Sequence, residues 1–440
     1  MSDLELSARA RDAAARYLGW LLIVLALALN PATLAFYSID GTLSGAALLL
    51  VMAAEASWIA LAVVILRRRP RWSAPAALVV TGGVAAMAAV EAFAVATGVL
   101  LPHGFEEHRE LFYSIEEPDP ELGFRLRPNL RGVSLTLEDA GLSTRYETDE
   151  RGFRNAGRDY AAADVFVLGD SFTFGVWVER ARTFYGLLET ELERPVITLG
   201  VEGYGLAQYR ILARRYLPAF RPRLAVLCIF ANDLRGTPAP DYLAGWYDAE
   251  GWSYFADAAY PKTSVLQNSS RILGQWLRAE PAPRKTSQGL SLFRAGMVSP
   301  DYLSSSKAQQ VEQALADIIE VARSNDVTLQ VFLFPSKESA YRTDYRKLYP
   351  PHDGRGRDGV AEEEEGYERL CRLAARHGVA CADLTPQFRA RVDAGSAPLY
   401  FADDGHWNEL GHEVAAGAML PLVQTALEAA GGLRPLAARD

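Results

Sequence analysis

The sequence of 440 residues predicts three N-terminal transmembrane helices followed by an α/β domain with a doubly wound parallel sheet. Three long apolar runs precede His103, and runs of about 20 apolar residues are long enough to cross a bilayer. From Asp164 onward, short apolar runs alternate with amphipathic helical stretches. Strands that are apolar throughout and are separated by helices indicate a parallel sheet covered on both faces. We therefore expect a membrane anchor at 1–103, a lead-in at 104–163 and the sheet domain at 164–440.

The anchor region contains three candidate membrane spans, at about 17–37, 45–66 and 74–101. The first run is too long for the apolar core of a typical signal peptide and is followed by two more, so we expect all three to be retained. Buried core helices of a large soluble protein are the alternative. Glu55 and Glu91 lie near the middles of the second and third spans, where they indicate either a proton or partner site or a helix–helix hydrogen bond.

The distribution of arginine predicts the orientation of the spans. Arg9, Arg11 and Arg16 precede the first span and RRRPR, residues 67–71, follows the second, whereas the loop SIDGTLS between them has no basic residue. Loops rich in Lys and Arg stay in the cytoplasm. The N-terminus is therefore expected in the cytoplasm, the anchor in the inner (cytoplasmic) membrane, and the sheet domain in the periplasm or outside the cell.

The charge of the region beyond the anchor argues against a nucleic-acid partner. The whole chain has a formal net charge of −9, and seven arginines face six acidic residues before His103, so the remainder carries about ten net negative charges. An acidic surface repels the phosphate backbone of nucleic acids. The expected partners are instead the lipid bilayer, an acylated glycan or small ester, and other subunits of a membrane complex, such as a multispan acyltransferase.

The sheet domain is expected to contain alternating strands and helices. Apolar runs predict strands at 165–169, 195–200, 223–230, 327–334 and 378–384. Amphipathic stretches predict helices near 180–192, 206–217, 306–324, 362–377 and 409–430. The lead-in contains PELGFRLRPNLRGVSL and TRYETDERGFRN, which predict short extended pieces with glycine turns.

A long aromatic-rich insertion at about 234–305 leaves the end of the third predicted strand. One interpretation is a lid or wall over the site, with stacking surfaces for a sugar or an acyl chain. The other is ordinary packing of an insertion onto the core. Elsewhere, Cys371 and Cys381 fall on a predicted helix and the strand after it, where they could form a disulfide, and Cys228 is expected to be buried.

Four sequence blocks carry groups suited to acyl transfer. Ser171 follows the first predicted strand, Gly203 the second and Asn232 the third, whereas Asp403 and His406 precede the last helix. In a parallel sheet, functional groups gather beyond the carboxyl ends of the strands. Histidine can accept the serine proton near neutral pH, and a carboxylate three residues earlier can hold the imidazole in the right tautomer. An asparagine side chain and the backbone N–H groups of the serine and the glycine suit a tetrahedral oxyanion.

The blocks GDSFTFG, GVEGYG, ND and D-x-x-H resemble the motifs of the SGNH hydrolase superfamily, also called the GDSL-like esterases. The resemblance implies a flavodoxin-like three-layer fold for the sheet domain. It implies that Ser171 is the nucleophile, that His406 is the general base and that Asp403 orients His406. It further implies an oxyanion hole made by the Ser171 amide, Gly203 and Asn232.

The sequence departs from the family pattern at two positions. Phe230 stands where the family has a glycine two residues before the asparagine, and Thr198 stands where an asparagine is common ahead of the block-two glycine. More loosely, the anchored layout and the segments TDERGFRN and FPSKESAY resemble the SGNH-like proteins of exopolysaccharide O-acetylation, such as those of alginate modification. That resemblance implies that Lys337 and Tyr341 lie near the pocket, and with Trp407 they are candidate substrate-binding residues.

Neighbouring residues have simpler interpretations. Asp170 is expected to hold the turn rather than to react, and His412 is expected to pack against or cap the last helix. Asp404 competes with Asp403 for the role of orienting the histidine, but the D-x-x-H spacing favours Asp403. The six histidines form no ligand-spaced pair, so we expect neither a metal nor a cofactor.

These patterns favour an extracytoplasmic ester hydrolase that works through an acyl-serine, on O-acyl groups of an envelope or secreted glycan or on a small ester. Transfer of the acyl group to a polysaccharide is the first alternative, because it uses the same triad with a multispan partner as the source of acyl groups. A non-catalytic structural or glycan-binding subunit of a membrane complex is the second.

Overall fold

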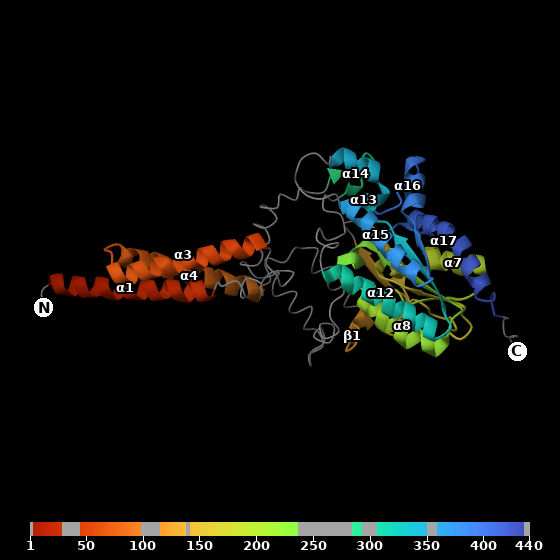
Figure 1. The fold of residues 1–440 in the computed structure, drawn as a ribbon, viewed down its shortest axis with the longest axis horizontal. Coiled ribbons are helices and arrows are strands. Elements are labelled where there is room, and N and C mark those ends of the chain that lie inside the picture. Colours follow the sequence, from red (N-terminus) through yellow and green to blue (C-terminus); the bar gives the residue numbers. More distant parts are fainter. Residues whose placement is uncertain are drawn as a thin grey trace. The chain divides into compact units, whose positions relative to one another are not determined.

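The structure, a computed structural model, describes residues 3–28, 45–97, 115–137, 141–235, 284–292, 306–349 and 359–434. The chain divides into two compact units (Figure 1). The helical unit contains the described residues up to Thr97, and the α/β unit contains the described residues from Ile115 onward.

The described residues of the helical unit form three helices, α1 (Asp3–Ala28), α3 (Gly45–Arg68) and α4 (Ser73–Thr97). Helix α1 packs against both of the others, and a small apolar core that includes Leu18 and Ile65 is buried between the helices. A helix therefore covers or overlaps each of the three predicted spans.

An ion-pair cluster joins the N-terminal part of α1 to the loop after α3. Asp12 pairs with Arg16 at 3.1 Å and also with Arg69. The basic N-terminal segment and the basic loop after α3 therefore lie at the same end of the helical unit.

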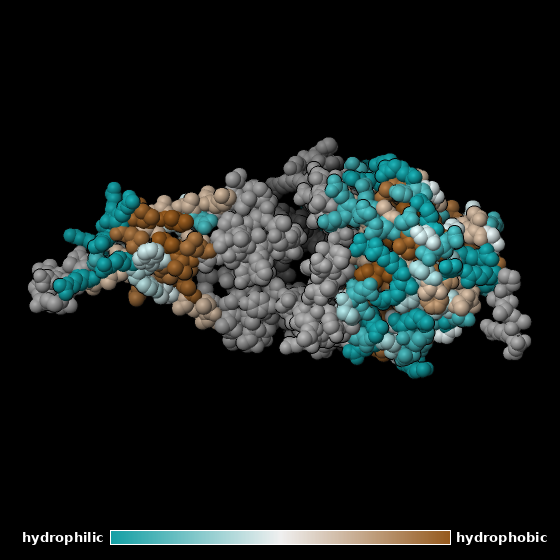
Figure 2. All heavy atoms as spheres, turned by 60° about the horizontal axis from the view of Figure 1, so that its bottom comes forward, coloured by the Kyte–Doolittle hydropathy of each residue, from teal (hydrophilic) through white to brown (hydrophobic). Residues whose placement is uncertain are grey.

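Large apolar side chains remain exposed on the helical unit, where Figure 2 shows brown surface, whereas teal prevails over the α/β unit. They come from all three helices and from the turn before α4: Tyr17, Trp20, Val24, Leu27, Met52, Trp58, Leu61, Val63, Val64, Trp72, Leu78, Val79, Val84 and Val90. Exposed apolar surface of this extent marks a membrane or partner contact. By length and composition, one stretch of the described residues, Ser73–Val90 in α4, is suited to cross a membrane.

The first and third predicted spans extend past the described residues, so three crossings remain a prediction. Glu55 lies half-buried within α3. The side chain of Glu91 lies outside the described residues, and neither interpretation of the two glutamates is tested.

The described part of the α/β unit contains a five-stranded parallel sheet with the order β11-β10-β7-β5-β6. Its strands are β5 (Val165–Leu168), β6 (Val196–Thr198), β7 (Leu224–Phe230), β10 (Thr328–Phe334) and β11 (Ala380–Asp383). Each strand lies within a predicted apolar run, which confirms the predicted parallel sheet. The strand order reverses at β5, because the chain passes from β5 to β6 and then returns to the other side of β5. Such a reversal creates the crevice in which α/β proteins bind ligands.

Helices cover both faces of the sheet (Figure 1). Helices α8 (Leu206–Phe220), α12 (Ser306–Ser324) and α15 (Gly359–Arg376) pack side by side on one face. Helices α7 (Phe184–Leu192) and α17 (Glu409–Ala429) pack together on the other. All residues of β5 and β7 are buried because both faces are covered.

Shorter helical segments connect these elements: α6 (Ser171–Phe174), η2 (Arg180–Arg182), η3 (Ala231–Arg235), α13 (Lys337–Ala340), α14 (Arg342–Leu348) and α16 (Thr385–Asp393). The lead-in forms two antiparallel hairpins, one of β1 (Glu116–Asp119) and β2 (Gly123–Leu126), the other of β3 (Val133–Leu137) and β4 (Leu142–Tyr146). The extended pieces predicted for the lead-in are therefore present.

Beyond η3, the described part of the predicted insertion is a short hairpin of β8 (Arg284–Lys285) and β9 (Ser291–Leu292). The aromatic segment interpreted as a lid lies outside the described residues. Cys371 of α15 and Cys381 of β11 form a disulfide with a Cα–Cα distance of 5.3 Å, and Cys228 is buried in β7. The disulfide that the sequence left open is thus present.

Candidate active site

Ser171 lies on a tight turn that follows β5, which we call the serine turn (residues 169–178). Asp170 caps helix α6, because its carboxylate accepts a hydrogen bond of 3.0 Å from the backbone N–H two residues later. A Cβ on Gly169 would lie 2.0 Å from a neighbouring side-chain oxygen, so this position has no room for a side chain. Gly175 ends α6 in the left-handed region with φ 76° and donates to the Ser171 carbonyl at 2.9 Å. The turn thereby holds Ser171 beyond the carboxyl end of β5.

His406 connects Ser171 to a carboxylate. Its Nε2 lies 2.7 Å from Ser171 Oγ, and its Nδ1 lies 2.6 Å from Asp404 Oδ1. The same Asp404 oxygen accepts the backbone N–H of His406 at 2.7 Å. With the proton on Nδ1 shared with Asp404, Nε2 is free to accept the proton of Ser171, so the three residues form a nucleophile–base–carboxylate relay.

The structure corrects the prediction that Asp403 orients His406. The Asp403 side chain is 69% exposed and accepts a hydrogen bond of 2.6 Å from Ser291 Oγ, while Lys285 Nζ pairs with it at 3.1 Å. The physical reason is the turn at Asp404: a carboxylate that accepts the backbone N–H two residues later is also brought beside the imidazole of that residue. Asp403, one residue earlier, points to the β8–β9 hairpin instead.

The charges in the relay favour an ionised carboxylate and a basic imidazole. Burial tends to raise the pKa of Asp404, but the hydrogen bonds and charge of His406 outweigh burial and lower the pKa to about 2. For His406, burial has the opposite effect and lowers the pKa, but the hydrogen bond and charge of Asp404 outweigh burial and raise the pKa above its usual value. Asp404 therefore stabilises the imidazolium that forms when His406 takes a proton.

Gly203 and Asn232, the predicted oxyanion donors, follow the two strands that flank β5. Gly203 lies in the loop after β6 with φ 76°, and Asn232 lies in η3 directly after β7. The loop after β6 also touches the serine turn, since a Cβ on Gly200 would lie 2.6 Å from the side chain of Thr173. The structure thus brings the segments that carry both donors to the same edge of the sheet as Ser171.

Three further carboxyl groups surround the relay. Burial raises the pKa of Asp170 and that of Asp233, and the charge of Asp170 raises the pKa of Asp233 further. Burial also raises the pKa of Glu202 to about 8. Glu202 was not identified from the sequence, where its one signal is its position beside Gly203. Asp404 is the carboxylate that is hydrogen-bonded to His406.

The candidate substrate-binding residues have other roles in the structure. Lys337 is 2% exposed, and its Nζ donates to the carbonyls of Phe401 and Ala402 at 3.0 Å each. Tyr341 is also 2% exposed, and its hydroxyl accepts the backbone N–H of Leu399 at 3.1 Å. Trp407 is fully buried in an aromatic cluster. Each of the three is thus buried and packs against the segment around Asp404 and His406, and their contact with substrate stays a prediction.

His412 packs as the sequence predicts. It lies in α17, it is 1% exposed, and its Nδ1 accepts the backbone N–H of Phe184 at 3.2 Å. Burial lowers its pKa to about 3, so it stays neutral and serves to join α17 to α7. Among the described residues, no group of three or more His, Cys, Asp or Glu side chains is arranged to hold a metal ion.

Several solved structures are similar to this chain at low sequence identity. A lipolytic protein of the G-D-S-L family from Veillonella parvula is 17% identical, with 59% of this chain and 98% of that chain covered and a TM-score of 0.34. An acetyl xylan esterase, AlAXEase, is 14% identical with the same coverages and TM-score. LAE5, an alpha/beta hydrolase enzyme from the metagenome of Lake Arreo, Spain, is 17% identical, with coverages of 62% and 99% and a TM-score of 0.33.

A comparison with curated proteins gives no match. The model of the GDSL-like lipase/acylhydrolase family, however, matches residues 167–414, which is more than half of the chain. The matched region contains Ser171, Gly203, Asn232, Asp404 and His406. This match confirms the resemblance to the SGNH superfamily, and the chain therefore belongs to the GDSL-like lipase/acylhydrolase family.

Proposed function

We propose that this protein is a membrane-anchored, extracytoplasmic serine ester hydrolase that works through an acyl-serine intermediate. One observation carries the proposal: His406 lies 2.7 Å from Ser171 Oγ on one side of its ring and 2.6 Å from Asp404 Oδ1 on the other. A serine activated in this way attacks carbonyl carbons.

The relay accounts for both halves of ester hydrolysis. Ser171 Oγ attacks the ester carbonyl carbon while its proton moves to His406 Nε2. Collapse of the tetrahedral intermediate breaks the bond to the alcohol oxygen, and the alcohol leaves with the proton from Nε2. Water then attacks the acyl-serine in the same way, and the acid is released. Backbone N–H groups of Ser171 and Gly203, with the amide of Asn232, would stabilise the oxyanion in both halves.

Three observations support the proposed location. The helical unit exposes many large apolar side chains, as a lipid-facing helix bundle does. The pair of Asp12 with Arg69 joins two segments that the arginine distribution assigns to the cytoplasmic side. The Cys371–Cys381 disulfide suits an α/β unit in an oxidising compartment.

The substrate class that we propose is an O-acyl group of an envelope or secreted glycan. An enzyme tethered to the outer side of the membrane meets such esters, and a serine relay cleaves them without a cofactor. Acyl transfer to a polysaccharide would use the same acyl-serine, with a sugar hydroxyl in place of water. The two reactions differ in the second nucleophile, so product analysis separates them.

The proposal is tested with the full-length protein in detergent, by its hydrolysis of an aryl acetate and of O-acetylated glycans. We expect turnover by the parent and loss of at least about 10³-fold in kcat for Ser171→Ala and for His406→Ala. Ser324→Ala, which changes an exposed serine of α12, serves as the control. Acetyl groups that appear on an added glycan rather than as acetate would indicate the transferase. A folded parent without turnover would indicate the non-catalytic subunit, and a fully active Ser171→Ala enzyme would contradict the proposed nucleophile.

A further inference from the structure

Arg154, in the lead-in outside the region matched by the family model, binds the serine turn. Its side chain is 1% exposed. Nη1 donates to the carbonyls of Phe174 at 2.6 Å and Gly175 at 3.0 Å, and Nη2 donates to the carbonyl of Val178 at 3.0 Å. One guanidinium thus donates to three carbonyls of the serine turn, at the last residue of α6, at its C-cap and at Val178.

Aromatic rings complete the surroundings of this guanidinium. It lies 4.7 Å from the centre of the Tyr146 ring and 5.2 Å from that of Phe174, and the two rings stack on each other. The Tyr146 hydroxyl also accepts the backbone N–H of Trp177 at 3.0 Å. A buried guanidinium is tolerated when its N–H groups are bonded and its faces meet aromatic rings. The lead-in therefore holds the serine turn through both a charged and an aromatic side chain.

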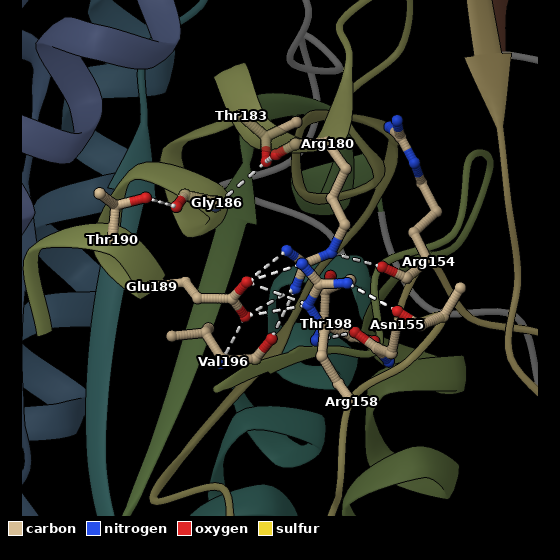
Figure 3. Close-up of polar contacts among 11 residues, drawn as sticks. Arg154, Asn155, Arg158, Arg180, Thr183, Gly186, Glu189, Thr190, Val196 and Thr198 are labelled. Atoms are coloured by element: carbon tan, nitrogen blue, oxygen red, sulfur yellow. Dashed lines mark hydrogen bonds and ion pairs between the residues drawn. The ribbon is translucent and has the colours of Figure 1, made fainter. Parts of the chain in front are cut away.

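The backbone of Arg154 is itself fixed by a neighbouring network, which Figure 3 shows. Arg180 Nε donates to the Arg154 carbonyl at 2.6 Å, and the guanidinium groups of Arg180 and Arg158 both bind Glu189. In Figure 3, Arg158 and Arg180 point to Glu189, whereas the Arg154 side chain points away from it. Arg180 thus supports the backbone of Arg154, whereas the Arg158 side chain binds Glu189 and the Ala156 carbonyl.

The residue after Arg154 binds the second site segment. Asn155 accepts the backbone N–H of Thr198 at 2.9 Å and donates to the Thr198 carbonyl at 2.8 Å. Thr198 ends β6, and the loop that follows carries Gly203. Two consecutive residues of the lead-in therefore tie the serine turn to the strand that precedes the proposed oxyanion donor.

We propose that Arg154 is a positioning residue for Ser171. Arg154 holds the serine turn so that Ser171 Oγ stays within hydrogen-bonding distance of His406. This inference rests on the proposed function. Helix α6 has four residues and cannot hold its own geometry, because so short a helix forms few internal hydrogen bonds. Loss of Arg154 removes the guanidinium donor from the Val178 carbonyl. It leaves the Phe174 carbonyl with the Tyr185 hydroxyl at 3.4 Å and the Gly175 carbonyl with the Val178 N–H at 3.2 Å, and movement of the turn relieves the lost hydrogen bonds. A shift of about 1 Å between reacting groups can cost on the order of 10²-fold in rate.

The experiment uses full-length Arg154→Ala in detergent, with aryl acetate as the substrate. We expect kcat to fall about 10²-fold while KM changes by less than about threefold, because the turn positions the nucleophile and does not bind the substrate. Ethylguanidinium, which replaces the atoms removed from the arginine side chain, should restore kcat at least about tenfold, whereas ethylammonium at the same concentration should not.

Arg158→Ala is the matched control, because the Arg158 guanidinium donates to Glu189 and to the Ala156 carbonyl, which lie outside the serine turn. The kcat of Arg158→Ala should stay within about threefold of the parent, although its loss of thermal stability is similar to that of Arg154→Ala. Ethylguanidinium should not change this kcat. If Arg154→Ala does not fold, Arg154→Lys replaces it. A lysine ammonium lacks the planar fork that reaches several carbonyls, so we expect a loss of at least about tenfold in kcat with KM unchanged.

The outcomes separate this inference from the proposed function. A parent that hydrolyses no ester overturns the proposed function and this inference with it. An active parent beside a folded Arg154 variant of parental kcat overturns this inference alone. Loss of kcat without rescue, matched by an equal loss in Arg158→Ala, also overturns it, because the effect would then follow general destabilisation.

Discussion

Replacement of Asp404 by asparagine tests the relay, because it keeps the size of the side chain and removes its charge. The carboxylate now accepts from His406 Nδ1 at 2.6 Å and from the His406 backbone N–H at 2.7 Å. If the oxygen of the new side-chain amide still accepts the His406 backbone N–H, the negative charge that stabilises the imidazolium is nevertheless lost. An amide that turns its NH₂ group to Nδ1 does more harm, because the ring proton then moves to Nε2 and blocks proton transfer from Ser171.

The expected loss of activity is large for Asp404→Asn and small for the same change at the preceding residue, Asp403. A charge-assisted hydrogen bond is about twice as strong as a neutral one, and a wrong tautomer removes the base altogether. We expect kcat/KM to fall by about 10²- to 10⁴-fold, or about 3–5 kcal/mol of transition-state stabilisation. Asp403→Asn is the matched control, because Asp403 is exposed and contacts Lys285 and Ser291, and its kcat/KM should stay within about threefold.

The pH dependence gives a second readout. His406 acts as a base when neutral, so kcat/KM should rise with pH through the pKa of His406, which lies above its usual value. In Asp404→Asn the carboxylate that raises this pKa is gone. The acid limb of the residual activity should therefore shift to lower pH, whereas it should stay in place in Asp403→Asn.

The assay is aryl acetate hydrolysis by the folded, full-length enzymes across the acid limb. Parental activity of Asp404→Asn, together with a large loss of activity in Asp403→Asn, would refute the assignment of Asp404. It would show instead that Asp403 orients His406, as the D-x-x-H spacing predicts. An acid limb that moves to higher pH in Asp404→Asn would refute the electrostatic reasoning.

Three further predictions concern the surroundings of the site. Lys337→Met removes the donor to the Phe401 and Ala402 carbonyls, so we expect a fall of at least about tenfold in kcat at similar KM, and a parental kcat would contradict its structural role. Replacing Cys371 and Cys381 by serine should lower the free energy of unfolding by about 2–3 kcal/mol, as measured by denaturant titration, and equal stability would count against the disulfide. The full chain should stay with the membrane after an alkaline carbonate wash, and its release would contradict a membrane-spanning anchor.

The sheet could be predicted from the sequence because its strands are buried on both faces. Runs such as Arg223–Phe230 contain no polar alternation, and β7 is buried along its whole length. The helix expected at 306–324 has the bounds of α12. Ser171 could be found because it closely follows the buried strand β5, and His406 because it lies in a D-x-x-H motif just before the last helix, α17.

Contacts between distant segments could not be predicted. Motif spacing favours Asp403, but a local turn brings Asp404 to His406, and sequence spacing does not encode which of two adjacent carboxylates makes that turn. The sequence suggests that Lys337 lies near the pocket. In the structure its ammonium group donates to two carbonyls that lie more than sixty residues later in the sequence. Arg154 lies in the segment TDERGFRN, but the sequence does not show what its side chain binds, because its three acceptors belong to another segment.

Covalent labelling of the full-length protein with a fluorophosphonate, followed by peptide mapping, shows whether Ser171 is an activated nucleophile. We expect one label per chain, located on Ser171, and a labelling rate that falls sharply in His406→Ala and hardly in Asp403→Asn. A folded protein that takes no label, or a label on another residue, would contradict the claim that Ser171 is the nucleophile activated by His406.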